Sequence, residues 1–274
     1  MKLNNIHTKT VKNSRDLFLT LQKANEANSH IQTIILEPGK YFADEDNIVL
    51  SVKKNLTIKG KYSNAKATHL NCGFLLGDNN TLILKNLAID YDGEECNTIA
   101  LYDGAELYGD NIIVDRTTES HWDTIFCKDS TLSLKNSEVL TDPTRNICGI
   151  SLKNSQIIAT HSNLNAPLLD NSTAYLKDVF TNYAFALKNK SNLSFTDLTL
   201  DTSQNTEFSD FYVDNHSTVT GINLNLPKKY SYIDVINSHF ENTNFASGLD
   251  NVRWRFDKNS TVLADGDEPF NNLA

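Results

Sequence analysis

The sequence predicts an all-β protein, a right-handed single-stranded parallel β-helix of about ten coils with a helix at its N-terminal end. Three observations predict it. A short phrase of alternating apolar and polar residues recurs at a spacing of about 25 residues. An Asn or Asp stands at a fixed offset in nearly every copy. With only 11 Gly and 5 Pro, the chain needs Asn, which tolerates the left-handed backbone region, to form its turns.

The first expected element is a capping helix over residues 14–28, with Ser14 as its N-cap. Leu17, Leu21 and Ala24 recur at helical spacing and therefore lie on one apolar face. We expect this face to cover the open first coil, so that the edge of the sheet is protected from pairing with another chain.

The coils are expected over residues 33–264, beginning with the segment Thr33–Tyr41. Residues 265–274 are expected to form a C-terminal tail that lies near the open last coil. No composition shift or linker divides the chain, so residues 1–274 are predicted to form a single domain.

Each coil contains two short strands that meet at a corner. In one clear copy Leu82 and Leu84 alternate with outward residues, and the alternation resumes after the corner at Leu87 and Ile89. We expect a left-handed backbone at every corner, with side-chain amides bonding from coil to coil. The eight corner residues are Asn86, Asn111, Asn136, His161, Asp178, Asp197, Asn223 and Asn244.

A third strand precedes each corner phrase and directs apolar pairs inward, for example Phe74 with Leu76 and Phe211 with Val213. Stacked coils of this kind bury about six side chains each, so no disulfide or metal is needed for stability. The cysteines match no zinc spacing and are expected to be free thiols, with Cys127 pointing inward. The four cysteines are Cys72, Cys96, Cys127 and Cys148.

The coil lengths, the corner residues and the segment Thr33–Tyr41 resemble the pectate lyase-like β-helix superfamily over about residues 14–264. The resemblance implies a substrate groove along the third-strand sheet and the loops before it. It implies no single activity, because this fold serves lyases, hydrolases, esterases, epimerases, phage tail proteins and inert scaffolds. The catalytic motifs of polygalacturonases, pectinesterases and pectate lyases are absent from the sequence.

The outward residues of the last third strands combine charge with aromatic rings. Asp210 and Asp234 are the candidate acid/base pair, because sheet geometry places their Cα atoms about 8 Å apart, near the carboxylate separation of inverting glycosidases. In the alternative, structural interpretation, Asp234 forms a cross-strand ion pair with Arg255 and Asp210 closes a turn. The candidate substrate-binding residues are Tyr212, Tyr232, Arg253, Arg255 and Asp214.

The longer loops of the early coils form a secondary candidate site. An arginine there could act as a base or clamp a uronate, and Trp122 could stack on a sugar. Carboxylates in the same loops could bind Ca²⁺, but no ligand spacing supports a metal, so no cofactor is predicted. The residues of this secondary site are Arg116, His121, Trp122, Asp123 and Arg145.

Composition limits the partners. A net charge of -9 disfavours nucleic acid, which binds to basic faces. No apolar run approaches the roughly 20 residues of a membrane helix, and no signal peptide is visible, so we expect a soluble protein that is cytoplasmic or exported by a non-Sec route.

The expected function is carbohydrate binding or carbohydrate modification in the groove of the third-strand sheet, with a polysaccharide or oligosaccharide as ligand. Catalysis is left open. The alternative is a non-catalytic interaction scaffold, such as an effector, surface or phage component, that binds another protein.

Overall fold

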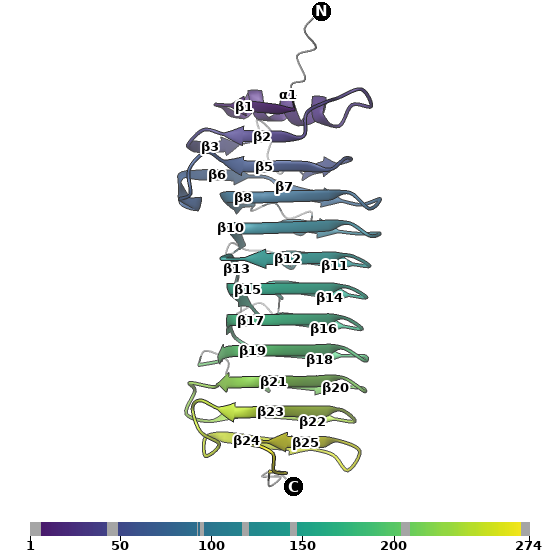
Figure 1. The fold of residues 1–274 in the computed structure, drawn as a ribbon, viewed down its shortest axis with the longest axis vertical. Helices are drawn as coiled ribbons and strands as arrows, with labels where there is room; N and C mark the ends of the chain where they lie inside the picture. Colours follow the sequence, from purple (N-terminus) through teal and green to yellow (C-terminus); the bar gives the residue numbers. More distant parts are fainter. Residues whose placement is uncertain are drawn as a thin grey trace, which may run out of the picture.

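A computed structural model describes residues 7–42, 49–91, 93, 96–116, 121–142, 147–203 and 209–269. The chain forms a parallel β-helix, in which successive coils stack along one axis from the N-terminal helix to the C-terminal strands (Figure 1). All strand pairs within the two described sheets are parallel, so the predicted fold class is confirmed.

The long sheet holds fifteen strands and contains the two corner-joined strands of each coil. In several coils these two strands run through the corner as one element of about ten residues, as in β8 and β17. The strands of the long sheet are β1 (Thr8–Val11), β2 (Thr33–Leu36), β3 (Gly39–Phe42), β5 (Leu56–Gly60), β6 (Thr68–Asn71), β8 (Thr81–Asp90), β10 (Glu106–Arg116), β12 (Thr131–Lys135), β13 (Glu138–Thr141), β15 (Gln156–Asn165), β17 (Thr173–Asn182), β19 (Asn192–Asp201), β21 (Thr218–Asn225), β23 (His239–Phe245) and β25 (Thr261–Ala264).

The ten-stranded sheet consists of the predicted third strands, stacked in sequence order. Together with the long sheet it encloses a core of aliphatic and aromatic side chains, including a run of neighbouring rings from Phe185 through Phe211 and Phe240 to Trp254. Its strands are β4 (Val49–Val52), β7 (Gly73–Leu76), β9 (Ile99–Leu101), β11 (Ile125–Lys128), β14 (Ile150–Lys153), β16 (Pro167–Asp170), β18 (Phe185–Lys188), β20 (Phe211–Asp214), β22 (Ser231–Ile236) and β24 (Val252–Phe256).

The eight predicted corner residues all have a left-handed backbone, with φ between 50° and 68°. Side chains join some neighbouring corners. The amide of Asn111 donates to Asn86 at 2.8 Å, and the amide of Asn223 donates to Asp197 at 2.6 Å. A residue that tolerates positive φ is therefore required at each corner, and its polar side chain can also link two coils.

A buried ladder of serines at the opposite end of the same strands was not predicted. Each serine backbone N–H donates to the hydroxyl of the serine one coil further on, at 3.0–3.3 Å. Except in the last coil, each hydroxyl also donates to a carbonyl two or three residues back in the chain, for example Ser155 to Lys153 at 2.8 Å. In the last coil the Ser260 hydroxyl donates instead to Val235 O at 2.9 Å and to Asp257 Oδ1 at 2.6 Å. The ladder therefore satisfies backbone groups that the turn would leave unpaired inside the protein. Its members are Ser130, Ser155, Ser172, Ser191, Ser217, Ser238 and Ser260.

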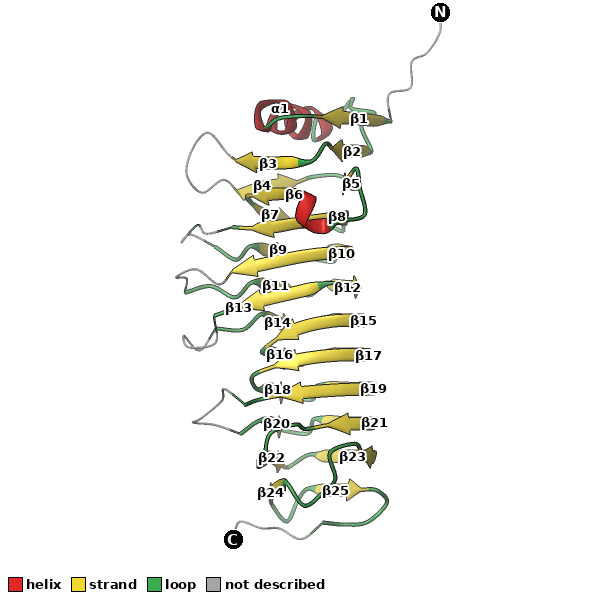
Figure 2. Cartoon of the chain, turned by 90° about the vertical axis from the view of Figure 1, so that its left-hand side faces the viewer, coloured by secondary structure: helices red, strands yellow, loops and turns green. Residues whose placement is uncertain are grey.

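Helix α1 (Ser14–Ala24) lies across the N-terminal end of the stack (Figure 2). Leu17, Leu21 and Ala24 are buried, as predicted. The N-cap prediction is wrong, because the side chain of Asn13 accepts the hydrogen bond from Asp16 N–H at 2.9 Å. The Ser14 hydroxyl instead accepts a hydrogen bond from the backbone N–H of residue 42.

Two boundaries also differ from the prediction. Helix α1 ends at Ala24 rather than at residue 28, because Asn25 bonds across to the next coil, donating to Ser51 O at 2.8 Å and accepting from Lys53 N–H at 2.9 Å. The stack begins before residue 33, since β1 pairs in parallel with β2. A single 3₁₀ turn, η1 (Ala65–Ala67), precedes β6, and residues 270–274 of the expected tail lie outside the described residues.

The cysteines are free thiols in the structure. Cys127 is fully buried, so the prediction that it points inward is confirmed. Burial also raises the pKa of the Cys72 thiol to about 12, because the thiolate would lose its hydration inside the core.

Candidate functional site

The outward column predicted for the ten-stranded sheet is present with the predicted register. Tyr212 on β20 lies beside Asp234 on β22, and Asp234 lies beside Arg255 on β24. In the same way Tyr232 lies beside Arg253. The sheet therefore brings together the charged and aromatic residues that the sequence analysis placed on this face.

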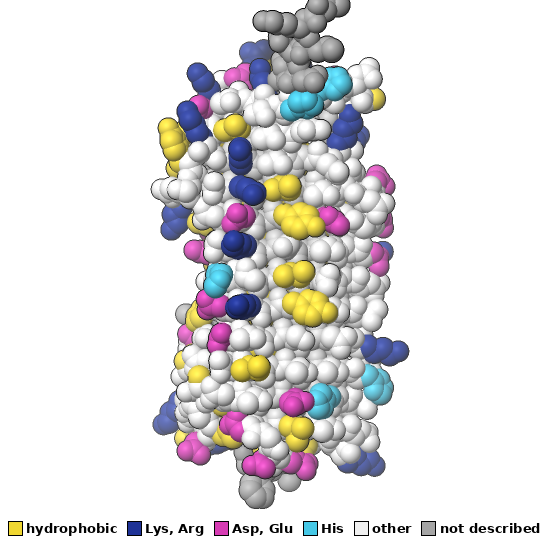
Figure 3. All heavy atoms as spheres, in the orientation of Figure 1, with side chains coloured by type: hydrophobic (Ala, Val, Ile, Leu, Met, Phe, Trp, Pro, Cys, Tyr) yellow, Lys and Arg dark blue, Asp and Glu magenta, His cyan; other side chains and the backbone are white. Residues whose placement is uncertain are grey.

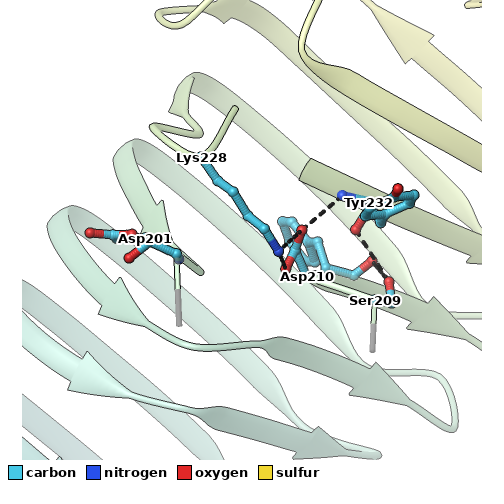
Figure 4. Close-up of polar contacts among 7 residues, drawn as sticks. Asp201, Ser209, Asp210, Lys228 and Tyr232 are labelled. Atoms are coloured by element: carbon cyan, nitrogen blue, oxygen red, sulfur yellow. Dashed lines mark hydrogen bonds and ion pairs between the residues drawn. The ribbon is translucent and has the colours of Figure 1, made fainter. Parts of the chain in front are cut away.

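Asp210 is fully buried at the start of β20. Its carboxylate accepts hydrogen bonds from Lys228 Nζ at 3.1 and 3.4 Å and from the backbone N–H of Tyr232 at 2.9 Å (Figure 4). Ser209 next to it donates to Tyr232 O at 3.3 Å. These contacts tie the segment before β20 to the coil that contains β22. Asp210 therefore has a structural role, but it joins two coils rather than closing a turn as the alternative interpretation expected.

Asp234 forms a two-point ion pair with Arg255, in which Nε and one terminal nitrogen of the guanidinium each donate to one carboxylate oxygen. The Asp234 side chain is nearly buried, whereas the Arg255 side chain remains 47% exposed. This is the cross-strand ion pair of the structural interpretation, and its planar geometry is the strongest that two such groups can adopt.

Two tyrosines, Tyr212 and Tyr232, lie near the ion pair of Asp234 with Arg255. Tyr232 is 37% exposed, and Tyr212 is partly buried with its hydroxyl donating to Asp214 Oδ2 at 3.0 Å. Partial burial, followed by the bond to Asp214, raises the pKa of the Tyr212 phenol above its ordinary value, so the ring is neutral at physiological pH.

Tyr230 was missed by the sequence analysis. It is 43% exposed, and the Arg253 guanidinium lies over its ring at 4.7 Å from the centroid. Arg253 also donates to Asp250 O at 2.9 Å, which holds its guanidinium over the ring. Tyr230 precedes β22 and so falls outside the alternating positions on which the prediction was based, and no signal in the sequence marks it.

Among the described residues, the candidates of the secondary loop site do not share one exposed surface. Arg116 is only 1% exposed, and its guanidinium donates to Thr98 Oγ1 at 3.2 Å and to Gly93 O. Its interior position follows from β10, where Ile112 and Val114 point inward at the same alternation. A sugar in solution cannot reach this guanidinium, so the assignment of Arg116 as an exposed clamp is wrong.

The other loop candidates differ in how far their side chains are exposed. Asp123 is mostly buried and accepts a hydrogen bond from the backbone N–H of Cys148 at 2.8 Å. Loss of hydration raises the pKa of the Asp123 carboxyl above its ordinary value. His121 and Trp122 are exposed, and Arg145 lies outside the described residues.

No helix among the described residues is long and apolar enough to span a membrane. Within the same ranges, no group of three or more His, Cys, Asp and Glu side chains converges to hold a metal ion.

No family model matches the sequence, and no curated protein matches it. Among solved structures it is similar to the catalytic domain of a GH87 alpha-1,3-glucanase variant in complex with nigerose, at 13% identity and a TM-score of 0.37 over 96% of this chain. This chain spans only 58% of that glucanase chain.

Two further solved structures are similar. A variant of pectate lyase from Xanthomonas campestris has 11% identity and a TM-score of 0.36, covering 96% of this chain and 81% of its own. A PL6 family polysaccharide lyase from Pseudopedobacter saltans has 10% identity and a TM-score of 0.30, covering 95% and 94%. The likeness is confined to the fold, and the parallel β-helix itself is shown by the strand pairing of this chain.

Proposed function

We propose that the protein is a non-catalytic carbohydrate-binding β-helix whose ligand contacts the outward rings on β20, β22 and the segment before β22. The observation that carries the proposal is the combination of exposed tyrosines with carboxylates that are already bonded. Tyr230 and Tyr232 are exposed, whereas Asp210 and Asp234 are held by Lys228 and Arg255.

The bonded carboxylates argue against acid/base work at this position. Asp210 has no exposed surface, so a substrate cannot contact it without a rearrangement of the chain. Asp234 would have to release Arg255 before it could exchange a proton with a sugar oxygen. A general acid or base needs to come within hydrogen-bond reach of the reacting oxygen, and neither carboxylate offers that here.

The rings supply what a binding surface needs. A pyranose ring has an apolar face that packs on a tyrosine and a polar edge that hydrogen-bonds to neighbouring groups. Arg253 stacks over Tyr230, and the exposed part of Arg255 lies one strand from Tyr232. Because Tyr232, Arg253 and Arg255 stand on paired strands, their relative positions are fixed before a ligand arrives.

A glycan array followed by calorimetry tests this proposal. We expect Tyr232→Ala to weaken binding of the best array ligand about tenfold or more, which is the loss of one well-packed aromatic anchor. Asp234→Asn should change the affinity by less than about threefold, and Tyr62→Ala, an exposed tyrosine remote along the chain, should leave it unchanged.

Three results would overturn the proposal. The first is that no glycan on the array binds. The second is that Tyr232→Ala binds as tightly as the wild type. The third is turnover of a bound glycan that disappears in Asp234→Asn while the melting temperature is unchanged, which would assign catalysis to the Asp210 and Asp234 pair.

A further inference from the structure

A second surface with binding geometry lies on the outward face of the long sheet. Figure 3 shows hydrophobic side chains in a line down this face, with Lys and Arg side chains in a line beside them. The register accounts for both lines. Ile158 pairs with Tyr175 in one outward column, and the neighbouring column carries Lys135 and Lys177.

The Tyr175 side chain, which is 47% exposed, stands between two open hollows of this face. The first hollow, of about 440 Å³, is lined by polar groups that include Asn154, Gln156 and Asn171. The second, of about 390 Å³, lies toward β21 and ends at Ile222, which is 52% exposed. Tyr175 lines both hollows, and we refer to the two hollows together as the Tyr175 groove.

The second hollow forms where small side chains occupy the outward positions after Tyr175. Ser194 and Thr220 follow Tyr175 in its column, and Thr196 follows Lys177 in the next. These three hydroxyl-bearing residues line the hollow together with the tyrosine. A ring-shaped ligand could therefore pack against Tyr175 while its hydroxyls bond to the protein below it.

The two hollows differ in charge. The first contains the Asp129 carboxylate, which accepts a hydrogen bond from the Asn154 amide at 3.1 Å. The second contains Lys177, which is exposed and has no hydrogen bond or ion pair through its ammonium group among the described residues. The nearby Asp178 bonds instead to the ring of His161 at 2.6 Å. Of the two hollows, the second thus carries an unpaired cation beside Tyr175, whereas the first carries a carboxylate.

We propose that the Tyr175 groove binds an extended oligosaccharide that carries carboxylate or sulfate groups. One sugar packs on Tyr175, and an acidic group of the oligosaccharide pairs with Lys177. Hydroxyl groups of the sugars that lie in the first hollow bond to the amides of Asn154, Asn171 and Gln156. Each Asn amide keeps a second N–H after its bond within the protein, so the amides remain able to donate.

The groove is long enough for several sugars. It crosses six coils, from the turn before β10 to β21, and parallel strands about 4.8 Å apart make this about 24 Å. Charge sets the direction in which the oligosaccharide binds, because its acidic group is attracted by Lys177 and repelled by Asp129. This site lies on a different sheet from the tyrosines of the proposed function and does not depend on them.

Calorimetry with three hexasaccharides tests the inference: a uronate hexamer, a sulfated hexamer and a neutral glucose hexamer. We expect at least one acidic hexamer to bind about tenfold more tightly than the neutral one. Tyr175→Ala should lower that affinity about tenfold, and Lys177→Gln should lower it about threefold at low salt and less at high salt. The acidic hexamer that binds identifies the charged group.

Matched variants provide the controls. Tyr108→Ala removes an exposed tyrosine of the same column that lines neither hollow, and Lys85→Gln removes a lysine of the neighbouring column that is paired with Asp110 at 4.0 Å. Both should bind like the wild type. Tyr175 and Lys177 point into solvent, so their variants should also unfold at the wild-type temperature.

The inference is overturned if no hexamer binds, if the neutral hexamer binds as tightly as the acidic ones, or if Tyr175→Ala has no effect. If Tyr232→Ala abolishes binding of the acidic hexamers while Tyr175→Ala does not, the ligand occupies the ten-stranded sheet and the proposed function alone survives. If sedimentation shows a wild-type dimer that Tyr175→Ala dissociates, the groove is an interface between two copies and the inference is wrong.

Discussion

Two carboxylates near the C-terminal end of the ten-stranded sheet are each paired with a cation, whereas Lys177 on β17 faces solvent beside an exposed tyrosine. Asp210 is paired with Lys228, and Asp234 is paired with Arg255. On the long sheet the Tyr175 ring borders two hollows, and the ammonium group of Lys177 has no partner among the described residues.

The difference separates groups that hold the coils together from groups that are free to meet a ligand. A buried charge is costly to expose or to leave unpaired, so the partners of Asp210 stabilise the stack. An exposed unpaired lysine contributes little to folding and can exchange water for an anion. Mutations in the two regions should therefore affect different measurements.

The largest expected effect is on stability, in Asp210→Ala. The change leaves the Lys228 ammonium and the Tyr232 N–H without their shared acceptor, and we expect the free energy of unfolding to fall by about 3 kcal/mol. Urea unfolding followed by circular dichroism measures this. The exposed Asp250→Ala and Tyr175→Ala variants should lose less than about 0.5 kcal/mol. Equal losses in all three variants would remove the distinction between the regions.

Asn136→Val should cost about 2 kcal/mol, because a β-branched residue is strained at the corner φ of 50°. Asn136→Gly is the matched variant, since glycine adopts the same backbone without strain and should cost clearly less. Equilibrium unfolding of the two variants separates strain from the lost side chain. A cost near zero for the valine variant would contradict the requirement for a left-handed corner.

Asp234→Asn should lower stability by only about 1 kcal/mol, because the exposed Arg255 can recover hydration when its partner loses charge. Thermal unfolding at low and high salt measures the change. A loss of stability as large as that of Asp210→Ala would mean that the ion pair of Asp234 with Arg255 stabilises the fold as much as the buried pair of Asp210 with Lys228.

The smallest effect concerns the thiols near neutral pH. The folded-state pKa of Cys72 is raised from 9.0 to about 12, so its contribution to stability is fully present below pH 9 and is lost only as the pH rises toward 12. We therefore expect no thiol-dependent change in the free energy of unfolding between roughly pH 6 and pH 8, because thiols stay protonated over this range.

Labelling gives a second test of the same thiols. Native Cys72 and Cys127 should resist alkylation at pH 8 because both are fully buried, whereas four labels should appear on mass spectrometry after unfolding without a reductant. Two labels instead of four would reveal a disulfide and contradict the expectation of free thiols.

The repeated pattern in the sequence was enough to predict the coils, the corner positions and the outward register of Tyr212, Asp234 and Arg255. Alternation and corner residues are local signals that every coil repeats. A coil whose own pattern is ambiguous can therefore be assigned from the coils next to it. The boundaries of α1 were less accurate, because Ser14 accepts a bond from the N–H of residue 42 and Asn25 donates to Ser51 O, and such contacts between coils are not visible in the sequence.

Long-range partners could not be predicted in the same way. Lys228 lies in a connection with no repeat, so nothing in the sequence placed it against Asp210. Arg116 follows the inward alternation of β10, but an arginine in a core contradicts the usual rule of burial. The Tyr175 groove depends on small residues in two neighbouring coils, and a hollow of this kind becomes apparent only when the coils are stacked.

Nuclear magnetic resonance of protein with isotope-labelled tyrosine rings is the most direct test of where a glycan binds. The chain has 10 tyrosines, spread over both sheets and the core, so one titration with an array-positive glycan reports on every region. We predict that the ring signals of Tyr230 and Tyr232 shift together on the ten-stranded sheet, that Tyr175 shifts with an acidic oligosaccharide, and that the buried Tyr41 does not move. A ligand that leaves Tyr175, Tyr230 and Tyr232 unchanged would contradict binding on either sheet.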